Sequence, residues 1–127
     1  MVTLRVTDIT KNPRWREKVP LNVIAAIDVD GWTEVSETET GAFYGKPPKG
    51  GPIRPIVQFD RDIVRASHLA RKASRETDSD IVITITPKSV FVEAFDGSDE
   101  ELFYEVAERT DSLAHMLTKC AVKLVND

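Results

Sequence analysis

The sequence contains one cysteine among 127 residues, which excludes an internal disulfide. Cys120 cannot hold a metal ion by itself, and no His and Cys residues have the spacing of zinc ligands. No apolar run approaches the roughly 18 residues of a membrane-spanning helix. The first residues, Met-Val-Thr-Leu-Arg, lack the basic-then-apolar order of a signal peptide. We therefore expect a cytoplasmic protein without a metal, a cofactor or a membrane partner.

The sequence also lacks a recognisable catalytic motif. It has no phosphate-binding glycine loop and no serine elbow. Neither His68 nor His115 has an obvious nucleophile and acid at a known spacing. Cys120 falls on an apolar helical seam, where a cysteine is usually a small core residue. We expect no catalytic residues.

Charge is distributed unevenly along the chain, whose net charge is −4. Residues 1–75 contain 13 Lys and Arg against 9 Asp and Glu, whereas residues 76–127 contain 4 against 12. Such a polarised chain is more suited to pairing its halves, within or between molecules, than to general polyanion binding. The length and the 41% apolar content are typical of one globular domain, which we assign to residues 1–127.

The first half of the chain predicts mainly strands. Residues 3–7 alternate like a short strand, and residues 21–40 read as a β-hairpin that turns at Asp30-Gly31. Residues 41–55 contain four prolines and four glycines, which predicts an irregular loop. Residues 56–59 fit either a short strand or the approach to the next helix.

The second half predicts two helices around a strand pair. We expect a helix over residues 60–75 and strands over 80–86 and 89–95, which pair antiparallel through Pro87-Lys88. From Asp99 to Val125, apolar residues recur at steps of three and four, which predicts a helix capped by Ser98 or Asp99. Either this helix is continuous, or it breaks at Thr110-Asp111-Ser112. The predicted fold class is α+β, with a mostly antiparallel sheet of four to five strands and two or three helices, the C-terminal one long and amphipathic.

A basic stripe on helix 60–75 is the most informative functional feature. At about 100° per residue, one narrow face carries Arg61, Arg65, His68, Lys72 and Arg75. A solvated helix face is the plainest interpretation. The alternatives are an acidic partner, such as Glu100, Glu101, Glu105 and Glu108 in the same or another chain, and nucleic acid.

Two further basic segments could extend this surface. The loop over 41–55 supplies Lys46, Lys49 and Arg54, and its prolines resemble a short polyproline ligand. Its Phe43 and Tyr44 either reach a partner or plug the core. Trp15 lies between two arginines, where it either stacks on a base or, as we favour, anchors the N-terminal segment.

Acidic residues gather between positions 28 and 39. Asp28 and Asp30 resemble the start of a metal-binding loop, but the strand-like pattern that follows favours a hairpin with a charged edge. A divalent-metal-dependent enzyme built on these two residues is the least favoured hypothesis.

The sequence is best interpreted as a non-catalytic interaction or assembly module. It would associate with itself as a dimer or larger oligomer, and with an unidentified protein that has an acidic surface; binding of nucleic acid is the alternative. We expect an apolar seam of the last helix to make the oligomer: Phe103, Val106, Leu113, Leu117, Cys120 and Leu124.

Overall fold

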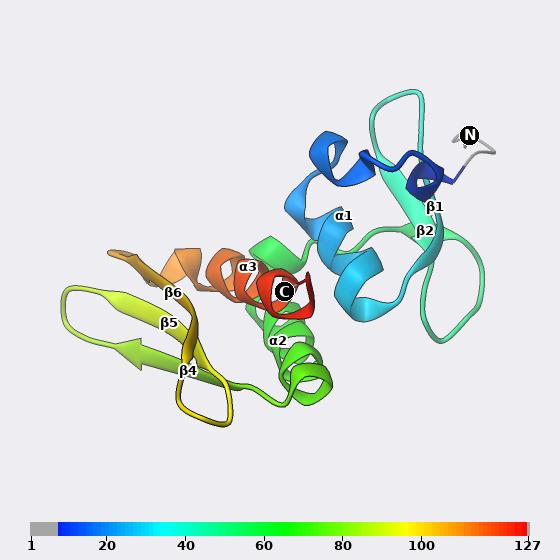
Figure 1. Ribbon diagram of the computed structural model, residues 1–127. Helices are drawn as coiled ribbons and strands as arrows, with labels where there is room; N and C mark the ends of the chain where they lie inside the picture. Colours follow the sequence, from blue (N-terminus) through cyan, green and yellow to red (C-terminus); the bar gives the residue numbers. More distant parts are fainter. Residues whose placement is uncertain (1–7, 127) are drawn as a thin grey trace.

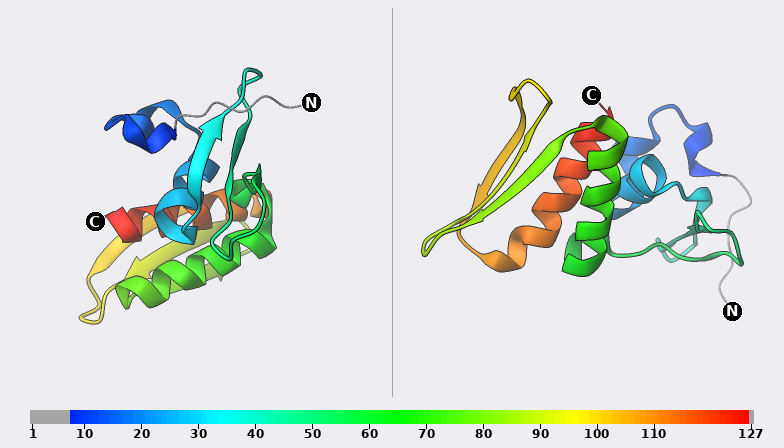
Figure 2. Two further views of the ribbon diagram at one scale, coloured as in Figure 1. Left: turned by 90° about the vertical axis from the view of Figure 1, so that its right-hand side faces the viewer. Right: turned by 90° about the horizontal axis from the view of Figure 1, so that it is seen from below.

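The computed structural model describes residues 8–126, which form an α+β fold. Helices α2 (Ile63–Thr77) and α3 (Leu113–Asn126) lie side by side between two sheets (Figure 1). The two further views in Figure 2 show the same order, with the β4–β6 sheet on one side of the helix pair and the N-terminal elements on the other. Each sheet has three antiparallel strands, ordered β1-β2-β3 and β4-β5-β6. The predicted single sheet of four to five strands is therefore wrong.

The remaining elements are short. The first sheet consists of β1 (Thr33–Glu37), β2 (Phe43–Lys46) and β3 (Arg54–Pro55), and the second of β4 (Asp80–Ile85), β5 (Val90–Phe95) and β6 (Glu101–Ala107). Single helical turns are η1 (Ile9–Lys11), η2 (Trp15–Lys18), η4 (Phe59–Arg61) and η5 (Thr110–Ser112), and α1 (Leu21–Ala25) continues into the π-helical η3 (Ala26–Asp30). The strand predicted over residues 3–7 lies outside the described residues.

Residues 21–30 are helical, so the first strand of the predicted hairpin is wrong. The buried residues Val23, Ala26 and Val29 recur every third position, which places them on one helical face against the core. Burial of that face outweighs the strand preference of the β-branched side chains. Gly31 ends the helix in the left-handed conformation, with φ of 86°, and the Trp32 amide donates to the Ala26 carbonyl. Asp30-Gly31 is thus a helix end rather than a hairpin turn.

The hairpin of this region forms later in the chain, between β1 and β2. Strand β2 then pairs with the two-residue β3, so the predicted loop over 41–55 contains two strands and is irregular at 41–42 and 47–53. Phe43 is partly buried against the core, as the core-plug interpretation expected, and Tyr44 is also partly buried. Residues 56–58 lead into η4 without forming a strand.

The strand pair β4–β5 and helix α2 match the prediction closely. Asp62 caps α2 by accepting hydrogen bonds from the Val64 and Arg65 amides. Strands β4 and β5 pair antiparallel from Asp80 opposite Phe95 to Ile85 opposite Val90. The alternation of apolar residues and the short turn between the strands explain why this part was predictable.

The predicted helix over 99–125 is wrong in its first half. Residues 101–107 form β6, and Asp96 makes the preceding turn by accepting hydrogen bonds from Ser98 and from the Glu100 amide. These bonds lower the pKa of Asp96, the bond from Glu100 contributing most. A helix begins only at Leu113, after η5, so the continuous-helix alternative is wrong. The other alternative placed the start of the last helix correctly after 110–112, but a strand and not a first helix precedes it.

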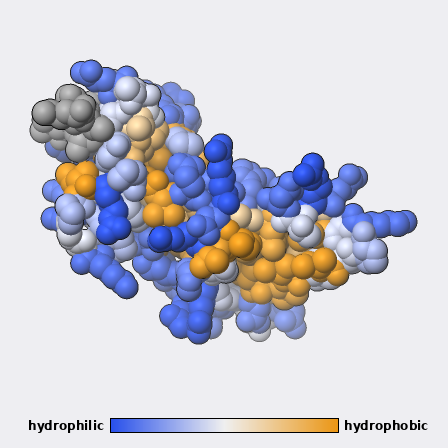
Figure 3. All heavy atoms as spheres, turned by 180° about the vertical axis from the view of Figure 1, so that it is seen from behind, coloured by the Kyte–Doolittle hydropathy of each residue, from blue (hydrophilic) through white to orange (hydrophobic). Residues whose placement is uncertain are grey.

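The core lies where α2 and α3 meet α1, η3 and the inner face of β5. Alanines at 66, 70 and 73 let α2 approach α3 closely, and Leu117 and Cys120 of α3 are fully buried. None of the described helices covers the outer face of the β4–β6 sheet, and several apolar side chains there are exposed. Figure 3 shows apolar surface gathered on the half of the molecule that contains this sheet and the long helices.

Candidate functional site

An open groove of about 710 Å³ lies between α2 and the loop that joins β2 to β3. Its walls come from segments that are far apart in the sequence. One wall is the basic face of α2, and the other is the Pro/Gly-rich loop together with the end of η3. Seven basic side chains line the groove: Lys49, Arg54, Arg65, His68, Arg71, Lys72 and Arg75.

Helix α2 presents these side chains to the groove because one of its faces is apolar and buried while the other is basic and exposed. The alanine face and Leu69 are buried against the core, while Arg65, His68, Arg71 and Arg75 are exposed. The helix rises about 1.5 Å per residue, so Arg65 and Arg75 start about 15 Å apart along the axis. The groove can therefore contact an extended anion at several points.

The loop is positioned by the first sheet. Tyr44 pairs with Pro55 and Gly45 with Arg54, so the chain returns toward α2 at Arg54. A Cβ atom built on Gly31 would lie 3.7 Å from Cβ of Pro48 and 4.0 Å from Nζ of Lys72. The loop, the end of η3 and α2 thus meet at one place.

Only one of the basic side chains is neutralised by a described residue. Nζ of Lys72 donates to the Asp30 carbonyl oxygen at 2.8 Å and lies 3.6 Å from the Asp30 carboxylate. The same carboxylate accepts from the Trp32 indole at 2.8 Å. Lys72 therefore serves to hold α2 against the end of η3.

The other cationic groups of the groove have no such partner in the part of the chain that the structure describes. Within residues 8–126, no side-chain hydrogen bond or ion pair engages Lys49, Arg54, Arg65, Arg71 or Arg75, and His68 is likewise unpaired. Asp30 is the acidic residue in the groove lining. The groove is consequently a concentrated positive surface on a chain whose net charge is −4.

The aromatic residues of the groove are not available for stacking. Trp32 is 5% exposed and Phe59 is 4% exposed, and both belong to the core. A base cannot lie flat on rings buried to this extent. The groove therefore offers charge and hydrogen-bond donors, which suit phosphate or carboxylate groups.

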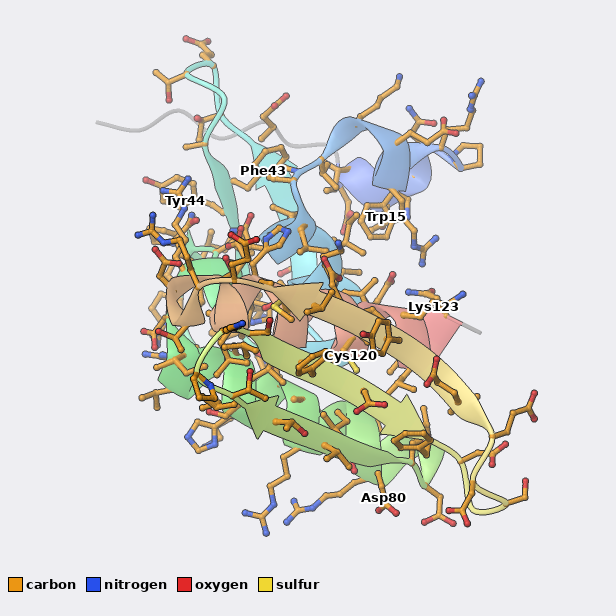
Figure 4. The ribbon with its side chains drawn as sticks, turned by 90° about the vertical axis from the view of Figure 1, so that its left-hand side faces the viewer. Trp15, Phe43, Tyr44, Asp80, Cys120 and Lys123 are labelled. Carbon is orange, nitrogen blue, oxygen red and sulfur yellow. The ribbon has the colours of Figure 1, made fainter. Side chains whose placement is uncertain are left out.

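Three residues of the predicted binding surface lie elsewhere. Arg61 belongs to η4 and does not line the groove. Lys46 lies 3.9 Å from the Glu34 carboxylate across the β1–β2 hairpin. Trp15 is buried in the N-terminal segment and lies away from α2 (Figure 4).

The surroundings of Trp15 agree with its interpretation as an anchor. The Arg16 guanidinium stacks 4.5 Å from the Trp15 ring and donates two hydrogen bonds of 2.8 Å to Asp28. Asn126 also donates to Asp28, so this carboxylate joins η2, η3 and the end of α3. The bond with Asp28 raises the pKa of Arg16.

Arg71 is the groove residue that the sequence prediction missed. It lies about 40° from Arg75 around the helix, just outside the narrow stripe. A wider arc would have included it, because a long arginine side chain reaches well beyond its own Cα position.

The residues considered for catalysis or metal binding do not converge. Asp28 and Asp30 engage different partners, and the residues that the structure describes contain no group of three His, Cys, Asp or Glu side chains placed to hold a metal ion. His115 is 3.9 Å from the Asp60 carboxylate at the surface of α3. Burial raises the pKa of the Cys120 thiol to about 12, so the reactive thiolate is suppressed at neutral pH.

The predicted oligomer seam is not one helical stripe. Phe103 and Val106 belong to β6, where the odd step between them places their side chains on opposite faces of the sheet. On α3, Leu117, Cys120 and Leu124 are buried within the chain, and Leu113 is packed against the same core. The α3 residues therefore stabilise the fold, and within residues 8–126 the six residues do not form one continuous helical seam.

The acidic residues predicted as an internal partner do not meet the groove. Glu105 lies on β6 and pairs with Lys119 at 2.8 Å, and none of Glu100, Glu101, Glu105 and Glu108 lines the groove.

Comparisons with family models, curated proteins and solved structures give no match. Among the described residues, no helix is long and apolar enough to cross a membrane.

Proposed function

We propose that this chain is a non-catalytic binding module that holds the phosphate backbone of a nucleic acid in the basic groove. One observation carries the proposal: five Lys and Arg side chains and His68, which have no side-chain partner among the described residues, line one groove between α2 and the loop that joins β2 to β3. Arginine and lysine side chains arranged along a groove bind phosphates and release the counterions that surround a nucleic acid.

The kind of recognition follows from what the groove offers. Phosphate contacts fix the position of a nucleic acid but carry no sequence information, and the buried aromatics provide no stacking platform. We therefore expect weak dependence on base sequence and strong dependence on salt. A protein with an acidic surface is the competing ligand, since carboxylates also bind arginine.

The test is a fluorescence anisotropy titration of labelled single- and double-stranded oligonucleotides at about 50 mM salt, where phosphate contacts are strong. The double variant Arg65→Gln, Arg75→Gln removes two groove charges. We expect it to weaken binding by about 10- to 100-fold, since each charge-assisted contact contributes on the order of 1 kcal/mol.

The control is a double variant with the same change in charge. Arg14 and Arg109 are exposed, pair with Glu17 and Asp111 respectively, and lie outside the groove lining. Arg14→Gln with Arg109→Gln should leave the affinity within about twofold, because these charges lie outside the groove and salt screens their effect on a ligand bound there. Equal losses in both double variants, or no binding by the parent protein, would refute the proposal. Binding of polyglutamate in place of oligonucleotides would assign the groove to an acidic protein.

A further inference from the structure

Strand β4 forms an unprotected edge of the second sheet. It pairs with β5 in continuous register, contains no proline and has one charged residue, Asp80, at its start. Natural edge strands usually avoid pairing with other chains through charges, prolines or β-bulges. In Figure 4, β4 is the outermost strand of the sheet, and α2 lies behind it.

The other sheet edges contain such protection. The register of β6 against β5 shifts between Ala94 and Phe95, and Glu101 and Glu105 place charges on the strand. In the first sheet, β1 contains two glutamates and β3 is only two residues long and ends in proline. Among the described strands, β4 therefore has the edge best suited to pairing.

Exposed apolar side chains lie along strand β4 on both faces of the sheet. Val82 and Ile83 are each 43% exposed and Ile85 is 64% exposed. A cleft of about 260 Å³ separates β4 from α2, with Ser67 on one side and Ile83 on the other. Ile63, at the start of α2, is 45% exposed on the same side of the helix as Ser67. The edge is thus flanked by apolar surface that pairing would bury.

We propose that a second copy of this chain pairs with β4 in antiparallel orientation, with Ile83 opposite the partner's Ile83. In this register Ile81 lies opposite the partner's Ile85, and Val82 opposite the partner's Thr84. Side chains directly opposite each other point to the same face, so the isoleucines cluster on the helix side of the sheet. A two-fold axis perpendicular to the sheet relates the copies and makes one sheet of six strands.

Charge favours a second copy in this orientation. Lys88, in the turn after β4, comes next to the start of the partner's β4, where Asp78 and Asp80 lie, and the two-fold axis repeats the arrangement. Within the described residues, no side-chain hydrogen bond or ion pair engages these three charged groups. Parallel pairing would instead place Asp80 beside its own copy. The strand is therefore self-complementary in sequence, in apolar surface and in charge.

The proposal is tested by light scattering on a size-exclusion peak of the full chain loaded at about 100 µM, which populates even a micromolar dimer. We expect a dimer that persists at high salt, because its contacts are mainly backbone hydrogen bonds and apolar burial. Ile85→Lys should shift the peak to monomer, with at least a tenfold rise in the dimer dissociation constant, while circular dichroism shows the fold retained.

Val106→Lys is the matched control, since Val106 is 47% exposed on the opposite edge strand and on the outer face. This variant should remain dimeric. A monomeric parent protein, a dimer that survives Ile85→Lys, or a dimer lost only in Val106→Lys would each overturn the proposal.

A cysteine variant checks the register. Residues opposite each other in an antiparallel pair have Cα atoms about 4.5–5.5 Å apart, which a disulfide can bridge. Ile83→Cys should form a covalent dimer under mild oxidation, whereas Val106→Cys should not. Cys120 is buried and does not compete. Failure of Ile83→Cys to cross-link more than Val106→Cys would overturn the proposed register.

Discussion

Gly45 gives the sharpest stability prediction, because it lies where the first sheet holds the groove loop. A Cβ atom at this position would lie 2.9 Å from Cγ2 of Val35, 3.2 Å from Cδ1 of Ile56 and 3.3 Å from the Thr33 carbonyl oxygen. Val35 is 1% exposed and Ile56 is 5% exposed, so neither side chain has free space to enter. Gly45→Ala therefore overfills the contact between β1, β2 and the segment after β3.

The expected cost is the balance of two effects. Inserting a methyl group into a well-packed contact costs about 1–3 kcal/mol. Replacing glycine by alanine also restricts the unfolded chain, which stabilises the protein by about 0.4–1 kcal/mol. We expect a net loss of about 1–2 kcal/mol in the free energy of unfolding, measured by urea denaturation with an unchanged m-value.

Gly97→Ala is the matched control for this variant. Gly97 lies in the β5–β6 turn, does not have a positive φ, and a Cβ there meets nothing within 4 Å. Its substitution should leave stability unchanged or raise it by up to about 1 kcal/mol. Equal stability of Gly45→Ala and Gly97→Ala would refute the packing described around Gly45.

Three further predictions concern the fold. Asp62→Ala removes the cap of α2 and should cost about 1 kcal/mol in thermal or urea unfolding; no loss would contradict the capping role. Asp28→Ala breaks the bonds to Arg16 and Asn126 and should cost about 1–3 kcal/mol, with faster proteolysis at the N-terminal segment as the second readout. Cys120, whose pKa is raised to about 12 from an ordinary value of 9.0, contributes stability that is complete below pH 9 and decreases as pH rises toward 12, by about 1.4 kcal/mol per unit at most. Between pH 9 and pH 12 the free energy of unfolding should therefore fall further in the parent protein than in Cys120→Ala, which has no thiol. Rapid reaction of the thiol in the folded protein at about pH 8 would contradict this.

The elements that the sequence predicted correctly are those in which local signals agree. In α2, the capping Asp62, the alanine face and the basic face all indicate one helix. In β4 and β5, alternation and a short turn indicate one hairpin. No alternative structure satisfies these patterns as well.

The errors arose where one pattern fits two structures. Val23, Ala26 and Val29 form a helical face, but Ile24 and Ile27 between them make the segment resemble a buried strand. Phe103 and Val106 have helical spacing but belong to a strand, because the Asp96 turn returns the chain to pair with β5. Burial of the helical face against the core decided the first case, and strand pairing decided the second; both depend on contacts with residues distant in the sequence.

The basic stripe of α2 could be predicted, but the groove could not. Its second wall depends on the β1–β2–β3 pairing, which brings Lys49 and Arg54 to α2, and the strand prediction for residues 21–30 obscured that pairing. The ion pair that neutralises Lys72 could not be predicted either, because its partner, Asp30, was assigned to a hairpin turn.

The salt dependence of oligonucleotide binding tests the central claim most directly. If the five unpaired Lys and Arg side chains each neutralise one phosphate, the slope of log K against log salt approaches about −3.5 on single strands and −4.5 on duplex, and affinity falls about 100- to 500-fold between 50 and 200 mM salt. Arg65→Gln with Arg75→Gln should bring the duplex slope near −2.7, whereas Arg14→Gln with Arg109→Gln should leave it unchanged. A slope that is the same for all three proteins would contradict binding in the groove.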